Sequence, residues 1–138
     1  MSPALPLPLL RATAEEARVL FDCMCALAGD ALAAAERGDE VALRRVLDER
    51  DRVAGRLAPL VGDLGRARGA AGGPRLAEAE VAGVVSAALA VQEADVRLAE
   101  RLSEIRARRT RELDWTSLSG AGDAYAAPPG RAPLDLLR

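Results

Sequence analysis

The sequence predicts an all-α protein: an elongated antiparallel three-helix bundle or coiled coil with a long third helix and a mobile C-terminal tail. Half of its 138 residues are apolar but only 2% are aromatic, and a core of alanine, leucine and valine suits closely packed helices better than a β-sandwich. Apolar positions also recur at alternating spacings of three and four residues. Breaks at Gly38 and at residues 69–73 divide these stretches into three helices.

The first helix is expected over residues 12–37, after an extended proline-rich lead at residues 1–10. Thr13 opens the sequence T-A-E-E, which has the spacing of a capping box and predicts the helix start. Alanine dominates the apolar stripe of this helix and permits close approach by a neighbour. Gly38 is the expected left-handed residue after the helix, and Asp39 can cap the next one. The second helix should therefore return antiparallel to the first.

The second helix, predicted over residues 39–68, carries the most regular seam. Its seam positions are Leu43, Val46, Arg50, Val53, Leu57, Leu60 and Leu64. Arg50 on this seam should reach an acidic partner or extend to the edge of the bundle. The candidate partners are Asp30, Glu93 and Asp95. Pro59 predicts a kink, with an end of the helix near Ala58 as the alternative.

The third helix is predicted over residues 74–114, with Pro74 as its first residue. Its expected apolar stripe is Val81, Val85, Leu89, Gln92, Val96, Ala99, Leu102 and Ile105. If the second and third helices are antiparallel about the turn at residues 69–73, residues 104–115 project about 18 Å beyond both neighbours at 1.5 Å per residue. We then expect the second helix to be the scaffold between the other two. The tail, residues 116–138, is expected to be flexible, with a short docking helix as the alternative.

Composition argues against several kinds of chemistry. The net charge is −2, so no global field favours nucleic acid. All 19 basic residues are arginine, and histidine is absent, which removes the Schiff-base amine and the commonest general base and metal ligand. Cys23 and Cys25 lie on different sides of a helix, with no zinc spacing. We therefore expect no enzyme activity, no catalytic residues, no cofactor and no metal.

Two further expectations concern location and an enzymatic alternative. The N-terminal segment lacks the basic start of a signal peptide, and no apolar run is long enough to cross a bilayer, which predicts a cytoplasmic protein without membrane insertion. Small all-helical chorismate mutases bind a dianionic substrate with arginines on long helices. Arg18, Arg50 and Arg52 would be the candidates here, although those enzymes also use a lysine, which this chain lacks.

Most of the chain resembles the FlgN/FliT-type flagellar export chaperones. The resemblance rests on the helix layout and on three short features: Gly38-Asp39, the L-D-E-R-D run at residues 47–51, and Ala124-Tyr125 after the last long helix. Pro59 and the glycine-rich segment at residues 62–73 depart from the family pattern.

The resemblance implies a cytosolic chaperone that binds C-terminal helices of hook-associated or filament-cap subunits and delivers them to the type III export apparatus. On this basis the candidate client-binding residues lie on the third helix: Val96, Leu98, Leu102, Ile105, Leu113 and Trp115. Each has bundle core as its alternative role, which is the favoured interpretation for Val96. Tyr125 is the candidate for docking at the export gate. The competing hypothesis is a structural coiled-coil protein that forms a homodimer or larger homo-oligomer.

Overall fold

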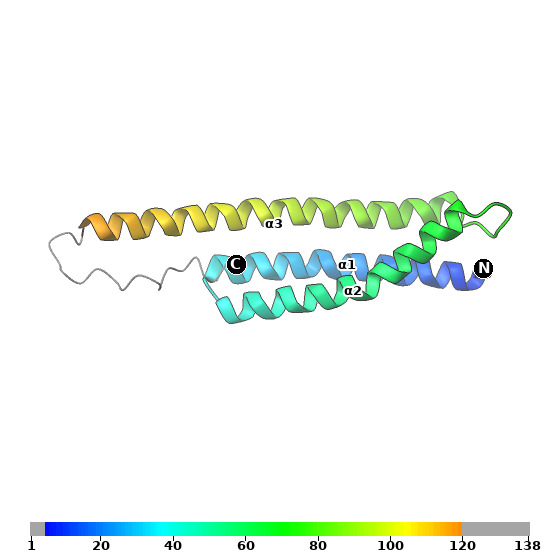
Figure 1. Cartoon of the computed structure of the whole chain (residues 1–138), viewed down its shortest axis with the longest axis horizontal. Helices are drawn as coiled ribbons and strands as arrows, with labels where there is room; N and C mark the ends of the chain where they lie inside the picture. Colours follow the sequence, from blue (N-terminus) through cyan, green and yellow to red (C-terminus); the bar gives the residue numbers. More distant parts are fainter. Residues whose placement is uncertain (1–4, 120–138) are drawn as a thin grey trace.

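The computed structural model describes residues 5–119, the last four of them as backbone only. Within this range the chain forms three α-helices and no strand: α1 (Leu7–Arg37), α2 (Glu40–Gly69) and α3 (Glu78–Ser119). The all-α three-helix prediction is confirmed. The helices lie alongside one another in an elongated bundle, with α1 and α3 parallel and α2 antiparallel to both (Figure 1). None of the three, in the part described, combines the length and apolarity needed to span a bilayer.

α1 begins at Leu7, so the extended lead predicted for residues 1–10 is wrong from that residue onward. The backbone N–H of Leu10 donates to the Pro6 carbonyl at 2.9 Å. Prolines are tolerated here because the first turn of a helix leaves its N–H groups unbonded. Leu10 is 1% exposed, so the added turns bury a large side chain. Thr13 is not the cap, since its hydroxyl donates to the carbonyl four residues earlier at 2.8 Å.

The turn between α1 and α2 forms as the sequence predicts. Gly38 is left-handed, with a φ of 69°, and its N–H donates to the Ala35 carbonyl at 3.1 Å. The N–H of Asp39 donates to the Ala34 carbonyl at 2.9 Å. The Asp39 carboxylate in turn accepts a hydrogen bond from the N–H of Ala42 at 3.1 Å. These bonds satisfy groups that both helix ends leave exposed, and they reverse the chain within two residues.

α2 continues through Pro59 to Gly69, so the alternative that it ends near Ala58 is wrong. Figure 1 shows α2 changing direction midway and crossing α1 toward the start of α3. The bend agrees with the predicted kink, because Pro59 has no N–H to bond the carbonyl of Gly55 and its ring crowds that turn.

α3 begins at Glu78 rather than Pro74, and it continues past the end predicted near residue 114. The Glu80 carboxylate accepts a hydrogen bond from the N–H of Ala77 at 3.3 Å. The Glu80 side chain thus reaches back from the first turn of α3 to the residue before the helix, as the glutamate of a capping box does. The connection between α2 and α3 consequently occupies residues 70–77.

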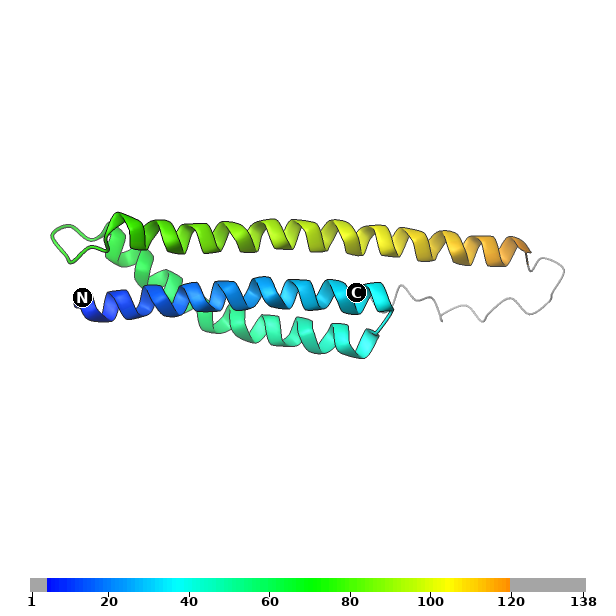
Figure 2. The ribbon, with the colours of Figure 1, turned by 180° about the vertical axis from the view of Figure 1, so that it is seen from behind.

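α1, and not α2, is the central helix. It packs extensively against both α2 and α3, and Figure 2 shows it between them from behind. α2 and α3 touch only locally, and one of their contacts is the ion pair between Arg50 and Asp95. The predicted acidic partner of Arg50 is thus confirmed. The expectation that α2 is the scaffold is wrong, because α1 is the helix that packs extensively against both of the others.

The two ends of the bundle have different cores. At the closed end, where α1 turns into α2, one cluster draws on all three helices. Its buried members are Ala28, Ala31, Ala34, Ala35, Leu43, Leu98 and Ile105. Toward the open end, where residues 70–77 connect α2 to α3, the second cluster consists of α1 and α2 residues alone among those described. Its buried members are Ala17, Leu20, Val53 and Leu57.

The buried seam of α3 differs from the predicted stripe. Its buried residues are Ala87, Val91, Leu98 and Ile105. By contrast, Val85, Leu89 and Val96 from the predicted stripe are 45%, 53% and 56% exposed. The small Ala87 is thus buried while these three larger side chains are exposed. The interpretation of Val96 as core is therefore wrong.

The projecting part of α3 begins at a later residue than predicted, and it is therefore shorter. Arg109 lies beside Gly38 and Asp39, so α3 is still level with the end of α1 at that residue. The projection is predicted to begin near residue 104. Because the connection at residues 70–77 is longer than expected, each residue of α2 lies level with a residue of α3 that is further toward the C-terminus. Figure 1 shows α3 continuing beyond the turn between α1 and α2.

Candidate functional site

The six predicted client-binding residues do not form one surface. Leu98 and Ile105 are buried in the closed-end core, at 5% and 1% exposure, and Leu102 packs half-buried against them. The exposed candidates are Val96 at 56% and Trp115 at 72%. Leu113 is half-buried near the projecting end of α3. Tyr125 lies outside the described residues.

Val96 belongs to a continuous exposed row that we call the α3 stripe. The row consists of Val85, Leu89, Gln92, Val96 and Ala99, all of them exposed. Their spacing alternates between four and three residues, so they share one face of α3, displaced from the buried seam. This spacing is typical of a helix that packs along a second helix, yet no described helix covers the row. The α3 stripe is thus an unpartnered apolar face.

An apolar groove lies at the open end, between the second half of α2 and the beginning of α3. Its volume is about 660 Å³, which falls within the range of sites that bind ligands or peptide side chains. Leu10 and Phe21 of α1 line it together with α2 and α3 residues. The groove lies beside the open-end cluster, whose described members come from α1 and α2.

The groove and the α3 stripe form one surface, because Val85 belongs to both. Arg68, Arg75 and Glu78 also line the groove and bring charge of both signs to it. The sequence does not predict the groove, because the predicted layout places α2 alongside α3. It does contain the α3 stripe, as a row of apolar residues on α3, but periodicity predicts that row as core.

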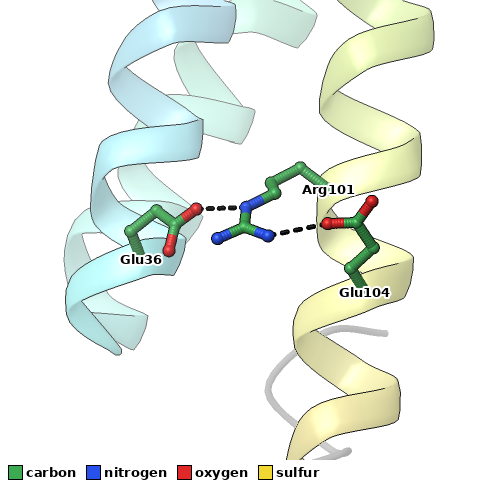
Figure 3. A network of polar contacts seen from close by, with 3 residues as sticks. All are labelled: Glu36, Arg101 and Glu104. Carbon is green, nitrogen blue, oxygen red and sulfur yellow. Dashed lines mark hydrogen bonds and ion pairs between the residues drawn. The ribbon is translucent and has the colours of Figure 1, made fainter.

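At the closed end, a polar network on the bundle surface joins α1 to α3. The Arg101 guanidinium contacts the Glu36 carboxylate through Nε and the Glu104 carboxylate through Nη1, the latter at 2.7 Å (Figure 3). The hydrogen bond from Arg101 lowers the pKa of Glu36 below its ordinary value. Hydrogen bonds to Glu36 and Glu104 raise the pKa of Arg101. The network ties the end of α1 to α3, away from the groove.

The arginines of the enzymatic alternative do not converge on a substrate site. Arg50 pairs with Asp95 across the helices, and Arg52 donates to Glu49 on its own helix at 2.9 Å. Arg18 lies 3.9 Å from the carboxylate of Glu15. None of these arginines lines the groove. The chorismate-mutase-like alternative therefore has no supporting geometry in the described part of the chain.

The groove also offers no metal site. Across residues 5–119, no group of three or more cysteine, aspartate and glutamate side chains could hold an ion. Cys23 and Cys25 are free thiols.

Comparisons with protein-family models, with curated proteins and with solved structures each gave no match. What the surface can do chemically therefore follows from its own shape and composition, which suit the burial of an apolar helix face.

Proposed function

We propose that the chain is a cytoplasmic export chaperone of the FlgN/FliT type, which holds an amphipathic helix of a hook-associated or filament-cap subunit for the type III export apparatus. The observation that carries the proposal is the α3 stripe joined to the apolar groove. The resemblance in helix layout and short motifs supplies the class of client. The surface supplies a place where a client helix can lie.

The exposed stripe is suited to reversible binding. Covering the half-exposed side chains of Val85, Leu89 and Val96 would contribute about 1 kcal/mol each from the area removed from water. The apolar face of the client and the groove would add to this. A chaperone needs such a contact because a client helix that stays exposed before assembly presents its apolar face to other chains.

The structure changes which residues should be tested for client binding. Leu98 and Ile105 support the fold from the core, so an acidic substitution at either would unfold the closed end instead of testing the surface. Val96 remains a candidate and gains Leu89 and Val85 as neighbours. Leu113 and Trp115 form a separate candidate surface on the projecting end of α3, and Tyr125 keeps its proposed role at the export gate.

The experiment is copurification of the full chain with hook-associated and filament-cap subunits. The variant Leu89→Asp with Val96→Asp should lose the client, while circular dichroism and the thermal midpoint stay close to those of the wild type. The matched control is Val19→Asp with Val41→Asp, which places the same charges on exposed valines of α1 and α2, outside the stripe and groove. Equal client recovery by both variants would contradict a role for the stripe.

Homo-oligomerisation is the second candidate function, and the heptad spacing of the stripe favours it. A second copy would then cover the stripe in place of a client. Sedimentation over a hundredfold concentration range separates the two. A monomer throughout supports the chaperone, whereas a dimer that dissociates in the Leu89→Asp variant supports the structural coiled coil.

A further inference from the structure

The α3 stripe has one polar side chain in the middle of its apolar row. Gln92 follows Leu89 by three residues and precedes Val96 by four, so all three lie on one face. A helix that covers this row removes the Gln92 amide from water. The amide then costs free energy unless the covering helix offers a hydrogen-bonding side chain opposite to it. A single polar residue in an apolar seam therefore fixes the register between α3 and the helix that covers it.

Acidic side chains flank the stripe on both sides. Glu93 and Glu100 lie along one edge and Asp95 along the other, at the positions that flank the seam in a heptad pattern. Two of these have arginine neighbours. Asp95 pairs with Arg50 from α2, while Glu93 lies 3.8 Å from Arg97, with both side chains more than 70% exposed. An exposed pair of this kind is weak and can exchange partners.

This charge pattern disfavours a second copy as the occupant. In an antiparallel pair of stripes each flank meets the same flank of the partner, so the edge that contains Glu93 and Glu100 would face itself. In a parallel pair Asp95 would face Glu100 of the partner subunit. Both arrangements bring like charges together, which costs free energy and selects against self-pairing. Basic side chains are the complement of these edges.

We infer that the α3 stripe and the groove select an amphipathic helix with a polar residue in the middle of its apolar face and basic residues beside that face. The span from Val81 in the groove to Ala99 corresponds to a partner helix of about five turns, or about 27 Å. The polar residue pairs with Gln92, and the basic residues face Glu93 and Glu100. This inference rests on the proposed function and specifies the chemistry of its client.

The test uses three synthetic 19-residue helical peptides and the full chain. The first peptide has a leucine seam, one central asparagine and lysine flanks. The second replaces the asparagine with leucine, and the third replaces the lysines with glutamates. Fluorescence anisotropy of labelled peptides gives their dissociation constants at low and at high salt. We expect the first peptide to bind at least about tenfold more tightly than the third, with the difference shrinking at high salt.

Variants of the chain assign this selectivity to particular residues. Gln92→Leu should lower the ratio of affinities for the asparagine and leucine peptides by about tenfold. Glu93→Gln with Glu100→Gln should weaken binding of the lysine peptide and reduce its salt dependence. The matched control is Glu15→Gln with Glu16→Gln, which removes the same charge from α1 and should leave all three affinities unchanged.

Several results would overturn the inference. The inference fails if no peptide binds, or if the lysine and glutamate peptides bind equally. It also fails if Gln92→Leu leaves the ratio of affinities for the asparagine and leucine peptides unchanged. The proposed function fails separately. If the peptides are discriminated as expected but flagellar subunits copurify equally with the wild type and the stripe variant, the selectivity stands and the chaperone role of the stripe does not. If subunits depend on the stripe but the peptides are not discriminated, only the inference is lost.

Discussion

The closed and open ends of this bundle are built from the same kinds of residues but are packed differently. At the closed end three helices share one core, and a polar network joins α1 to α3 across its surface. At the open end α2 crosses α1, the described core joins α1 to α2, and an apolar groove lies beside the first turns of α3. One bend in α2 thus separates a part of the molecule with a three-helix core from a part with an exposed apolar groove.

The largest expected difference between core and stripe comes from truncating one apolar residue in each. Ile105 is 1% exposed in the closed-end core, so Ile105→Ala should lower the free energy of unfolding by about 2–5 kcal/mol. Leu89 is 53% exposed on the stripe, so Leu89→Ala should change it by less than about 0.5 kcal/mol. Urea unfolding followed by circular dichroism measures both. Equal losses would show that the stripe is buried in solution.

The ion pair of Arg50 and Asp95 lies between the closed and open ends, and its removal should have a smaller effect on the free energy of unfolding. The Arg50 side chain is 17% exposed and Asp95 45% exposed, so the pair is only partly removed from water. Arg50→Leu should cost about 1–2 kcal/mol because Asp95 loses its partner, while Arg50→Leu with Asp95→Ala should recover most of that loss. A double-mutant cycle of thermal unfolding provides the measurement. Additive losses would mean that the pair does not join α2 to α3.

The bend in α2 can be tested at Gly55, which precedes Pro59 by one turn. A Cβ built at Gly55 meets nothing within 4 Å, and the residue lies inside a helix. Gly55→Ala should therefore stabilise the protein by about 0.5–1 kcal/mol through helix propensity. Denaturant midpoints at constant m-value give the result. Destabilisation would indicate that the bend requires glycine at this point.

The smallest expected effect is the pH dependence of the closed-end network. The pKa of Glu36 is lowered by its hydrogen bond to Arg101, so this carboxylate stabilises the folded chain above its unfolded pKa, and the contribution is lost as the pH falls through the folded pKa. Glu36→Gln should therefore flatten the decline of unfolding free energy between about pH 5 and pH 3. Glu49→Gln on α2 is the control. Identical slopes in all three proteins would contradict a role for the network.

Local sequence signals determined much of the helix layout. The turn at Gly38 and Asp39 depends on a left-handed glycine and a carboxylate cap that act within a few residues. The seam of α2 also follows from periodicity. Charge predicts an acidic partner for Arg50, and the structure selects Asp95 from the three candidates. The start of α1 was misplaced because the T-A-E-E run has the form of a cap, whereas burial of Leu10 favours an earlier start that the prolines permit.

The client-binding surface could not be predicted in the same way. α3 has two rows with apolar residues, and periodicity does not tell which one faces the bundle. The sequence predicts the row from Val85 to Ala99 as core, whereas the structure buries Ala87, Val91, Leu98 and Ile105. Leu98 and Ile105, predicted from the family resemblance as client-binding residues with bundle core as the alternative, therefore lie in the core.

The sequence by itself therefore determined that the chain is helical, where its main turns lie and which charged residue crosses between helices, because these depend on local backbone chemistry and periodicity. Only the tertiary structure decided that α1 is central, that α2 crosses it, and that the row from Val85 to Ala99 is left uncovered. The crossing of α2 depends on its direction after the bend at Pro59. That direction is set by which side chains pack together across distant parts of the chain.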